Sequence, residues 1–188
     1  MSNKKGAIVA IEPASGELLS LVSAPSYNPN LLVGRERSKN YFELYKDSIY
    51  KPLIDKGLLS TFPAGSPFKV IVGLIALQEN VINDKNTIFC GGEYIYGRNK
   101  KSMKCHCGGG YRNIYNAISE SCNSYFADAY RKTISINNNI SENFDMWSEG
   151  VKSFGLGNYL NNDLPIGKKG MIPNSEFYDR WYPDFRWG

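Results

Sequence analysis

The sequence lacks the features of several common classes of protein. No segment approaches the ~20 consecutive apolar residues that a membrane-spanning helix requires, and the first residues do not have the pattern of a secretory signal peptide. The net charge of +4 is small, and lysine and arginine form no sustained run, so nothing in the charge pattern indicates nucleic-acid binding. No internal repeat is visible. An apolar content of 42% over 188 residues is instead enough for the core of one domain.

The most informative segment joins a serine and a lysine at the start of an apolar run. Ser66 stands three residues before Lys69, and the apolar stretch 70–77 follows directly. Residues at i and i+3 share one face of a helix, so the lysine amine can reach the serine hydroxyl. An amine desolvated by apolar neighbours can act as the base that a hydroxyl nucleophile needs. Pro67 suits the first helical position, which predicts that Ser66 lies at a helix N-terminus, where the dipole favours developing negative charge.

A second polar element, Ser121-x-Asn123, follows in the second half of the chain. Each element alone has an ordinary structural explanation, because Ser66 can be a helix N-cap and Ser121 can cap the helix after it. Together and in this order they favour a catalytic interpretation. On a turn, Ser121 can pass a proton between Lys69 and a leaving amine, and the Asn123 carboxamide can hold the lysine and a substrate amide.

These motifs resemble those of the transpeptidase domain of class B penicillin-binding proteins, and most of all the penicillin-binding protein 2 type. The resemblance extends over nearly the whole chain and keeps the order of the family's motifs. It is carried by the segments 6–30, 62–69, 117–126, 154–157 and 163–167. It implies an α+β fold of the β-lactamase/transpeptidase type, in which helices pack on an antiparallel sheet.

The third motif of that family, Lys-[Ser/Thr]-Gly, is missing. The nearest string, Lys168-Lys169-Gly170, lacks the hydroxyl and follows Ser121 too soon, so we interpret it as a basic loop. The chain ends at Gly188, before the strand that carries this motif in the family. We therefore expect the N-terminal part of a transpeptidase domain, incomplete because the later strands are not in this chain.

The expected organisation of residues 1–188 has four recognisable parts. They are an opening hairpin over 6–24, a nucleophile helix over 65–79, a Cys/Gly-rich excursion over 88–111, and second-motif helices over 113–132. The nucleophile helix is apolar almost all round, so we expect it to be buried. Shorter helices are expected around 41–45 and over 144–154, and residues 155–188 are expected to be loop-like.

The resemblance implies a peptidoglycan D,D-transpeptidase of bacterial cell-wall elongation. Ser66 would attack a D-Ala-D-Ala stem peptide with Lys69 as base, and the amine of a neighbouring strand would then attack the acyl-enzyme to form a crosslink. β-Lactam antibiotics would acylate the same serine, and no cofactor would be required. The parent protein would be anchored in the cytoplasmic membrane by an upstream helix absent from this chain, would face the periplasm, and would work with cell-wall elongation proteins in the membrane.

This chain alone is expected to be inactive or nearly so. The backbone N–H of Ser66 would supply half of an oxyanion hole, and the other half lies beyond the missing third motif in the family. Loss of one oxyanion donor costs about 10²–10³-fold in rate. A sheet edge left without its later strands would also invite pairing with a second copy, so a homodimer of the fragment is one expected state.

Three cysteines and the only histidine fall in the excursion, at Cys90, Cys105, His106 and Cys107. Structural zinc takes four Cys or His ligands, and the resemblance adds that some relatives of penicillin-binding protein 2 hold zinc near this place. A periplasmic compartment favours disulfides instead, with Cys90 bonded to Cys105 or Cys107, because the last two stand too close to pair easily. We favour a disulfide or free thiols over zinc, since the paired Cys-x-x-Cys is missing and a lone histidine is more often structural. Cys122 lies within the second motif.

Two other functions share part of this pattern. A serine β-lactamase or β-lactam sensor has both motifs, but we find no glutamate placed to deacylate the enzyme, and the opening hairpin and the stretch 163–165 favour the transpeptidase. A non-catalytic wall-binding module would retain the scaffold without the chemistry. Zinc binding by the thiols and acylation of Ser66 by a penicillin would separate these hypotheses.

Overall fold

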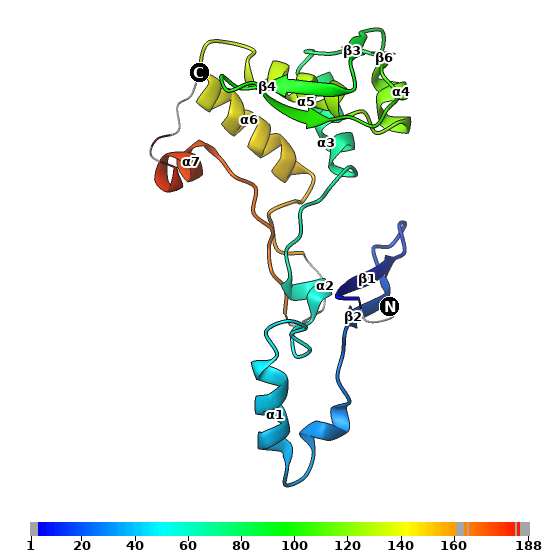
Figure 1. Ribbon diagram of the computed structural model, residues 1–188, viewed down its shortest axis with the longest axis vertical. Coiled ribbons are helices and arrows are strands. Elements are labelled where there is room, and N and C mark those ends of the chain that lie inside the picture. The colour runs from blue at the N-terminus through cyan, green and yellow to red at the C-terminus, as the bar shows by residue number, and fades with distance from the viewer. Residues whose placement is uncertain (1–3, 161–163, 165, 183, 185–188) are drawn as a thin grey trace. The chain divides into compact units, whose positions relative to one another are not determined.

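The computed structural model describes residues 4–160, 164, 166–182 and 184. The chain divides into two compact units (Figure 1): the hairpin unit, residues 1–62 with 159–168, and the helical unit, residues 63–158 with 169–188. Asp163, Pro165 and Gly188, which the sequence analysis singled out, lie outside the described residues. Within the described ranges, no helix has the length and apolar character that crossing a membrane requires.

The hairpin unit begins with two antiparallel strands at the place of the expected opening hairpin. Its elements are β1 (Gly6–Ile11), β2 (Leu18–Ala24), the 3₁₀ helix η1 (Pro29–Leu32), α1 (Arg37–Lys46) and α2 (Lys56–Leu59). Gly6 pairs with Ala24, and the register shifts once near the end of β1. The Glu12 carboxylate closes the connecting turn by accepting a 2.7 Å hydrogen bond from the Ser15 N–H. Local turn chemistry therefore fixes the register of this hairpin.

The interior of the hairpin unit is polar. Among its described residues only Lys56 is buried, with 2% of its surface exposed. The Lys56 ammonium donates hydrogen bonds to the carbonyls of Pro25, Lys51 and Ile54, at 3.4, 3.1 and 3.3 Å. Burial, together with the positive charge of Lys5, lowers the pKa of Lys56. Backbone carbonyl groups, rather than a carboxylate, therefore bind this ammonium.

The helical unit contains the apolar core. Its helices are α3 (Phe68–Gln78), α4 (Ile114–Ser119), α5 (Asn123–Ile134), α6 (Ile140–Ser153) and α7 (Ser175–Trp181). Helix α3 packs against both α5 and α6. A Cβ added to Gly73 would lie 3.2 Å from a ring carbon of Phe126, so glycine lets α3 approach α5 closely. The core residues at this junction include Ile75, Phe126 and Val151.

Helix α3 departs from the expectation that the nucleophile helix is buried all round. Its buried residues Val72, Gly73, Ile75 and Ala76 face α5 and α6, whereas Val70 and Leu74 are each 45% exposed. The apolar sequence predicted the helix but not its environment, because no described element covers the opposite face. The expected burial is therefore wrong for one side of α3.

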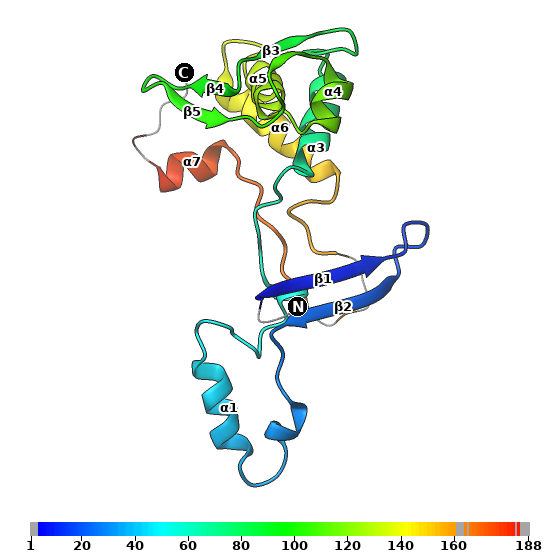
Figure 2. The ribbon, with the colours of Figure 1, turned by 45° about the vertical axis from the view of Figure 1, so that its right-hand side comes forward.

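The excursion over 88–111 forms two small antiparallel ladders. Strand β3 (Ile88–Cys90) pairs with β6 (Gly110–Arg112), and β4 (Glu93–Tyr96) pairs with β5 (Lys101–Lys104). The β4–β5 hairpin lies against α5 (Figure 2). The glycines at 108, 109 and 110 all have positive φ, which L-residues adopt at a cost, so this Gly run allows the chain to turn back into β6.

The last part of the helical unit is more ordered than expected. Residues 155–188 were expected to be loop-like, but α7 lies within them. The Asn174 side chain caps α7 by accepting from the Phe177 N–H at 3.0 Å, and the Asp145 carboxylate accepts from both the N–H and the hydroxyl of Ser175, at 2.7 and 2.6 Å. A side chain far away in sequence therefore stabilises a helix that is too short to be evident from its own pattern. Helix α6 also begins earlier than expected, after the cap at Asn139.

Candidate active site

Ser66 lies in the turn that leads into α3, and its side chain is exposed. Gly65 before it has φ +67°, a conformation that glycine adopts without strain. The Ser66 carbonyl accepts from the Lys69 N–H at 3.0 Å, so the first helical turn already spans the serine and the lysine. The motif spacing thus places a solvent-accessible hydroxyl at the helix entrance.

Ser121 links the two ends of the first motif. The Lys69 ammonium donates to the Ser121 hydroxyl at 2.8 Å and to its carbonyl at 2.6 Å. The Ser121 and Ser66 hydroxyl oxygens lie 2.9 Å apart. We expected Lys69 to reach Ser66 directly, but the hydrogen bonds described for its ammonium both go to Ser121. A continuous path for a proton therefore runs from Ser66 through Ser121 to Lys69.

The backbone at Ser121 is unusual for a serine. Helix α4 ends with a Schellman motif, in which the Cys122 N–H bonds to the Ala117 carbonyl at 2.8 Å and the Ser121 N–H bonds to the Ile118 carbonyl at 3.1 Å. The residue at the position of Ser121 in this motif is left-handed and is usually glycine. Ser121 adopts φ +54° there. A hydroxyl-bearing residue kept in such a conformation points to a role in function rather than in folding.

Asn123 begins α5, and its side chain contacts β5 rather than Lys69. The Asn123 carboxamide donates to the Lys104 carbonyl at 2.7 Å, and its backbone N–H donates to the Cys105 thiol at 3.1 Å. The sequence analysis expected the carboxamide to hold the lysine. In the structure it instead ties the second motif to the β4–β5 hairpin.

The electrostatic surroundings of Lys69 favour its use as a base. Burial lowers the pKa of Lys69, because a charged ammonium is poorly solvated there. Negative charge on Cys105, Cys122 and Cys107 acts in the opposite direction. The net shift is downward, so the neutral amine is more accessible than in a solvated lysine.

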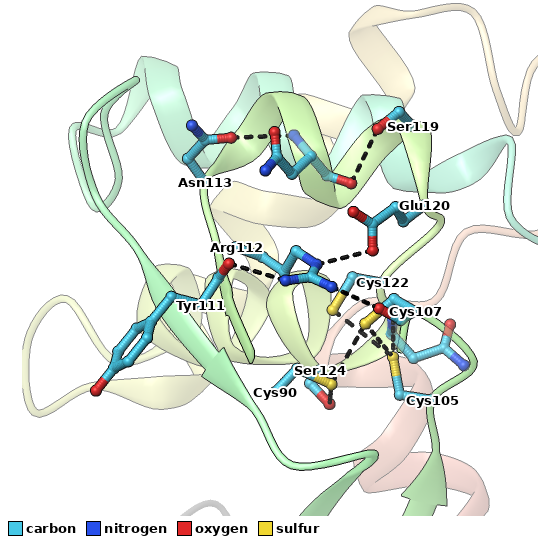
Figure 3. A network of polar contacts seen from close by, with 12 residues as sticks. Cys90, Cys105, Cys107, Tyr111, Arg112, Asn113, Ser119, Glu120, Cys122 and Ser124 are labelled. Carbon is cyan, nitrogen blue, oxygen red and sulfur yellow. Dashed lines mark hydrogen bonds and ion pairs between the residues drawn. The ribbon is translucent and has the colours of Figure 1, made fainter. Parts of the chain in front are cut away.

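The four cysteines, one of which is Cys122 of the second motif, lie close together (Figure 3). All four sulfur atoms, of Cys90, Cys105, Cys107 and Cys122, lie within 4.8 Å of one another. Three of the separations are 3.3 Å for Cys105–Cys107, 3.4 Å for Cys107–Cys90 and 3.6 Å for Cys105–Cys122. We call this group the cysteine cluster.

The membership of the cysteine cluster differs from the ligand set suggested by the sequence. His106 is exposed, and Cys122 takes the fourth place. Cys105 and Cys107, on either side of His106, both belong to the cysteine cluster, whereas the residue between them is exposed. The sequence signal that could have revealed Cys122 was its position next to Ser121, because the second motif was expected to lie at the active site.

Burial and hydrogen bonding distinguish the four thiols. Cys90, Cys107 and Cys122 are buried and Cys105 is half-buried. Burial raises the pKa of both Cys107 and Cys122. For Cys105 burial acts in the same direction, but hydrogen bonds from the Ser124 and Cys107 N–H groups outweigh it and lower its pKa to about 5. Cys105 is therefore the thiol most ready to carry negative charge.

The described geometry fits a tetrahedral metal site. Zinc bound by thiolates at about 2.3 Å requires sulfur–sulfur separations of about 3.8 Å. The cluster, with three separations of 3.3, 3.4 and 3.6 Å and none above 4.8 Å, needs little movement to meet this value.

Arg112 supports the cysteine cluster from outside. It donates to the Cys107 carbonyl at 2.7 Å and pairs with Glu120 at 2.8 Å (Figure 3). Such outer contacts orient the residues of a metal site. Arg112 therefore joins the loop that carries Cys107 to the end of α4.

The string Lys168-Lys169-Gly170 does not replace the missing third motif. These residues form no strand, and the Lys168 N–H donates to the Leu58 carbonyl at 2.9 Å within the hairpin unit. The described site thus consists of the first two motifs and the cysteine cluster.

Comparison with known proteins identifies the family. The family model of the penicillin binding protein transpeptidase domain matches residues 6–185. The peptidoglycan D,D-transpeptidase MrdA of Acinetobacter baumannii is 32% identical over 179 residues, which are 94% of this chain and 25% of that protein. The chain therefore spans about a quarter of the length of this curated relative.

Solved structures agree with this family. The complex between PBP2 and MreC from Helicobacter pylori matches with a TM-score of 0.80 and 30% identity, over 100% of this chain and 33% of that one. The penicillin G acyl-enzyme complex of penicillin-binding protein A from M. tuberculosis matches with a TM-score of 0.69 and 26% identity, over 91% and 39%. The α+β fold described above is thus a part of the β-lactamase/transpeptidase fold. The chain belongs to the penicillin-binding protein transpeptidase family and represents part of a domain of the PBP2 (MrdA) type.

Proposed function

We propose that this chain carries the acylation centre of a peptidoglycan D,D-transpeptidase that crosslinks D-Ala-D-Ala stem peptides during cell-wall elongation. The observation that carries this proposal is the path from Ser66 through Ser121 to Lys69, with steps of 2.9 and 2.8 Å. A hydroxyl and an amine joined in this way form an activated nucleophile with its base. The relationship to enzymes named D,D-transpeptidases supports the choice of substrate.

The proposed reaction moves one proton out and back along this path. As Ser66 Oγ bonds to the carbonyl carbon of the penultimate D-Ala, its proton passes to Ser121 while Ser121 gives its own to neutral Lys69. When the C–N bond breaks, the same path returns a proton to the departing D-Ala amine. The amine of a neighbouring stem peptide then attacks the ester carbonyl carbon. As the C–N bond forms and the C–O bond to Ser66 breaks, the proton that the amine loses passes along the path to Ser66 Oγ and restores the free hydroxyl. β-Lactams enter by the first step and remain as a stable ester.

A serine β-lactamase remains the less favoured function. Rapid deacylation needs a base that activates water, and the carboxylate nearest in sequence to Ser121 is Glu120. This carboxylate is held by Arg112 at 2.8 Å. Because Glu120 is paired with Arg112, it is not placed to activate water for deacylation. A long-lived acyl-enzyme is therefore favoured.

We propose in addition that the cysteine cluster holds a structural zinc ion through Cys90, Cys105, Cys107 and Cys122. Bound zinc would neutralise the thiolates and fix the spacing of the loops that carry them. Since Cys122 lies between Ser121 and Asn123, its bond to zinc would also hold the second motif in place. The transpeptidase chemistry itself uses no cofactor.

The cellular setting is likewise proposed from the relatives. Enzymes that crosslink peptidoglycan act outside the cytoplasmic membrane, so we place the parent protein in the periplasm, anchored in that membrane. The Helicobacter pylori relative was solved with MreC, which supports an elongation protein of this kind as a partner.

Intact-mass measurement after incubation with penicillin G tests the proposed acylation. The incubation is long, so that slow acylation is also detected. The expected result is one adduct that disappears in Ser66→Ala. An adduct that survives in Ser66→Ala, or none on the chain extended through a Lys-[Ser/Thr]-Gly motif, would refute the proposal.

Metal analysis tests the zinc proposal separately. Protein purified under reducing conditions should bind one zinc per chain, and Cys122→Ser should bind it far more weakly. His106→Ser is the matched control, because it changes the exposed member of the Cys-x-Cys tripeptide and should keep the metal. Zinc loss in His106→Ser together with full zinc binding in Cys122→Ser would restore the ligand set suggested by the sequence.

A further inference from the structure

The four thiols of the cysteine cluster differ in access to solvent and in distance from one another. Cys105 is half-buried, whereas the other three are buried. A dissolved oxidant therefore reaches Cys105 more readily than the other three residues. Cys105 lies at the end of β5, and Cys122 lies in the second motif, so a bond between them would join the excursion directly to the active site.

We propose that the cysteine cluster is a site of reversible oxidation by hydroperoxides, in which Cys105 reacts first and then forms a disulfide with Cys122. Cys107 and Cys90 form a second disulfide on further oxidation. The chemistry stands on the thiols alone, while its effect on acylation rests on the proposed function.

Three sulfur–sulfur distances support this pairing. The sulfur of Cys105 lies 3.3 Å from that of Cys107 and 3.6 Å from that of Cys122. A disulfide between Cys105 and Cys107 would close a ring over a single intervening residue and strain its geometry. It would also leave Cys90 without its neighbour, since the sulfur of Cys107 lies 3.4 Å from that of Cys90. Bonds between Cys105 and Cys122 and between Cys107 and Cys90 use all four thiols at contact distance.

The oxidation balances with peroxide as the only oxidant. The Cys105 thiolate attacks one peroxide oxygen, the O–O bond breaks, and sulfenic acid and hydroxide form. The Cys122 thiol then attacks the sulfenic sulfur, a disulfide forms and water leaves. Two electrons pass from sulfur to oxygen in each such cycle. A second peroxide oxidises Cys107 and Cys90 in the same way, after which no thiolate remains to hold a zinc ion.

The first disulfide would act on the second motif. A disulfide bond is about 2.05 Å long, so the 3.6 Å separation of Cys105 and Cys122 must shorten by more than an ångström. Cys122 follows Ser121, whose hydroxyl stands between Lys69 and Ser66 at 2.8 and 2.9 Å. A displacement of this size at a reacting group costs about 10²-fold in rate. Oxidation should therefore switch off acylation before the fold is lost.

Peptide mapping tests the pairing without reference to activity. Trypsin releases Cys90 in residues 86–98, Cys105 and Cys107 together in 105–112, and Cys122 in 113–131. Zinc-loaded protein is treated with limiting and then excess hydrogen peroxide, its free thiols are alkylated, and its peptides and released zinc are measured. Limiting peroxide should join 105–112 to 113–131 through Cys105, identified by fragment ions, and leave Cys90 alkylated. Excess peroxide should join all three peptides and release the zinc.

Other outcomes would overturn the inference. A disulfide inside 105–112, a first link from 105–112 to 86–98, or sulfinic acid without any link would each contradict the proposed order. His106→Ser should give the same map as the unchanged protein.

Reduction completes the test. A thiol reductant with zinc should restore free thiols and, with them, the rate of penicillin acylation. If the reduced chain, extended through a Lys-[Ser/Thr]-Gly motif, is never acylated, the proposed function fails while the peptide map still decides the oxidation chemistry. If the oxidised protein is acylated at the full rate, the link to the second motif is wrong.

Discussion

The left-handed backbone of Ser121 allows stability and function to be separated at one position. We compare Ser121→Ala with Ser121→Gly. Both remove the hydroxyl between Lys69 and Ser66, so both lose the same hydrogen bonds. They differ in backbone preference, because φ is +54° at this residue and only glycine adopts such a value without strain.

The expected difference follows from two opposing contributions. An L-residue in the left-handed region costs roughly 1–2 kcal/mol, whereas glycine raises the entropy of the unfolded chain by about 0.4–1 kcal/mol. Ser121→Gly should therefore be about 1 kcal/mol more stable than Ser121→Ala, which corresponds to about 2–4 °C in melting temperature for a chain of this size.

Denaturant unfolding and penicillin acylation together check this reasoning. Both variants should acylate at least about 10²-fold more slowly than the unchanged protein, as expected when a group that transfers a proton is lost. An alanine variant as stable as the glycine variant would refute the argument from strain. Full acylation in either variant would show that the proton does not pass through Ser121.

Three further predictions follow from the same site and its supports. The rate of penicillin acylation should rise with pH as Lys69 loses its proton, and it should fall as the pH decreases. Because burial lowers the pKa of Lys69, the rate should reach its plateau below the ordinary lysine pKa of 10.5. An acylation rate that does not change with pH would argue against this base. Asn123→Ala removes the 2.7 Å hydrogen bond to the Lys104 carbonyl, which should lower the free energy of unfolding by about 1 kcal/mol and speed amide hydrogen exchange at the end of β5. Unchanged exchange would show that this contact does not hold the hairpin. Gly73→Ala places a Cβ 3.2 Å from the Phe126 ring. Despite the higher helix propensity of alanine, it should destabilise the fold by about 1 kcal/mol in denaturant unfolding. A more stable variant would mean that α3 and α5 can move apart.

The sequence was sufficient to predict that Ser66, Lys69 and Ser121 lie at one site, because they belong to short local patterns. Ser66 and Lys69 lie one helical turn apart, and any helix at this point brings them together. The contact of the Lys69 ammonium with Ser121 was not predictable in the same way. Whether Lys69 bonds to Ser66 or to Ser121 depends on how α4 and α5 meet α3, and this is a property of tertiary packing.

For the cysteine cluster, spacing along the sequence was not sufficient. Spacing alone grouped Cys90, Cys105, His106 and Cys107, because they are neighbours in one excursion. The structure exchanges His106 for Cys122, a residue from another element. Backbone direction at the Cys-x-Cys tripeptide decides which side chains turn inward, and composition carries no information about that direction. Helix α7 was missed for a related reason, since its cap includes Asp145 from α6.

The polar interior of the hairpin unit has a consequence for any measurement of the stability of this chain. Lys56 is the only buried residue described there, whereas the buried apolar side chains of the described chain all belong to the helical unit. Apolar burial provides most of the heat-capacity change and the cooperativity of unfolding. A melting curve of this chain would therefore report on the helical unit. Amides in β1 and β2 would exchange with solvent through local opening, long before the signal of global unfolding changes.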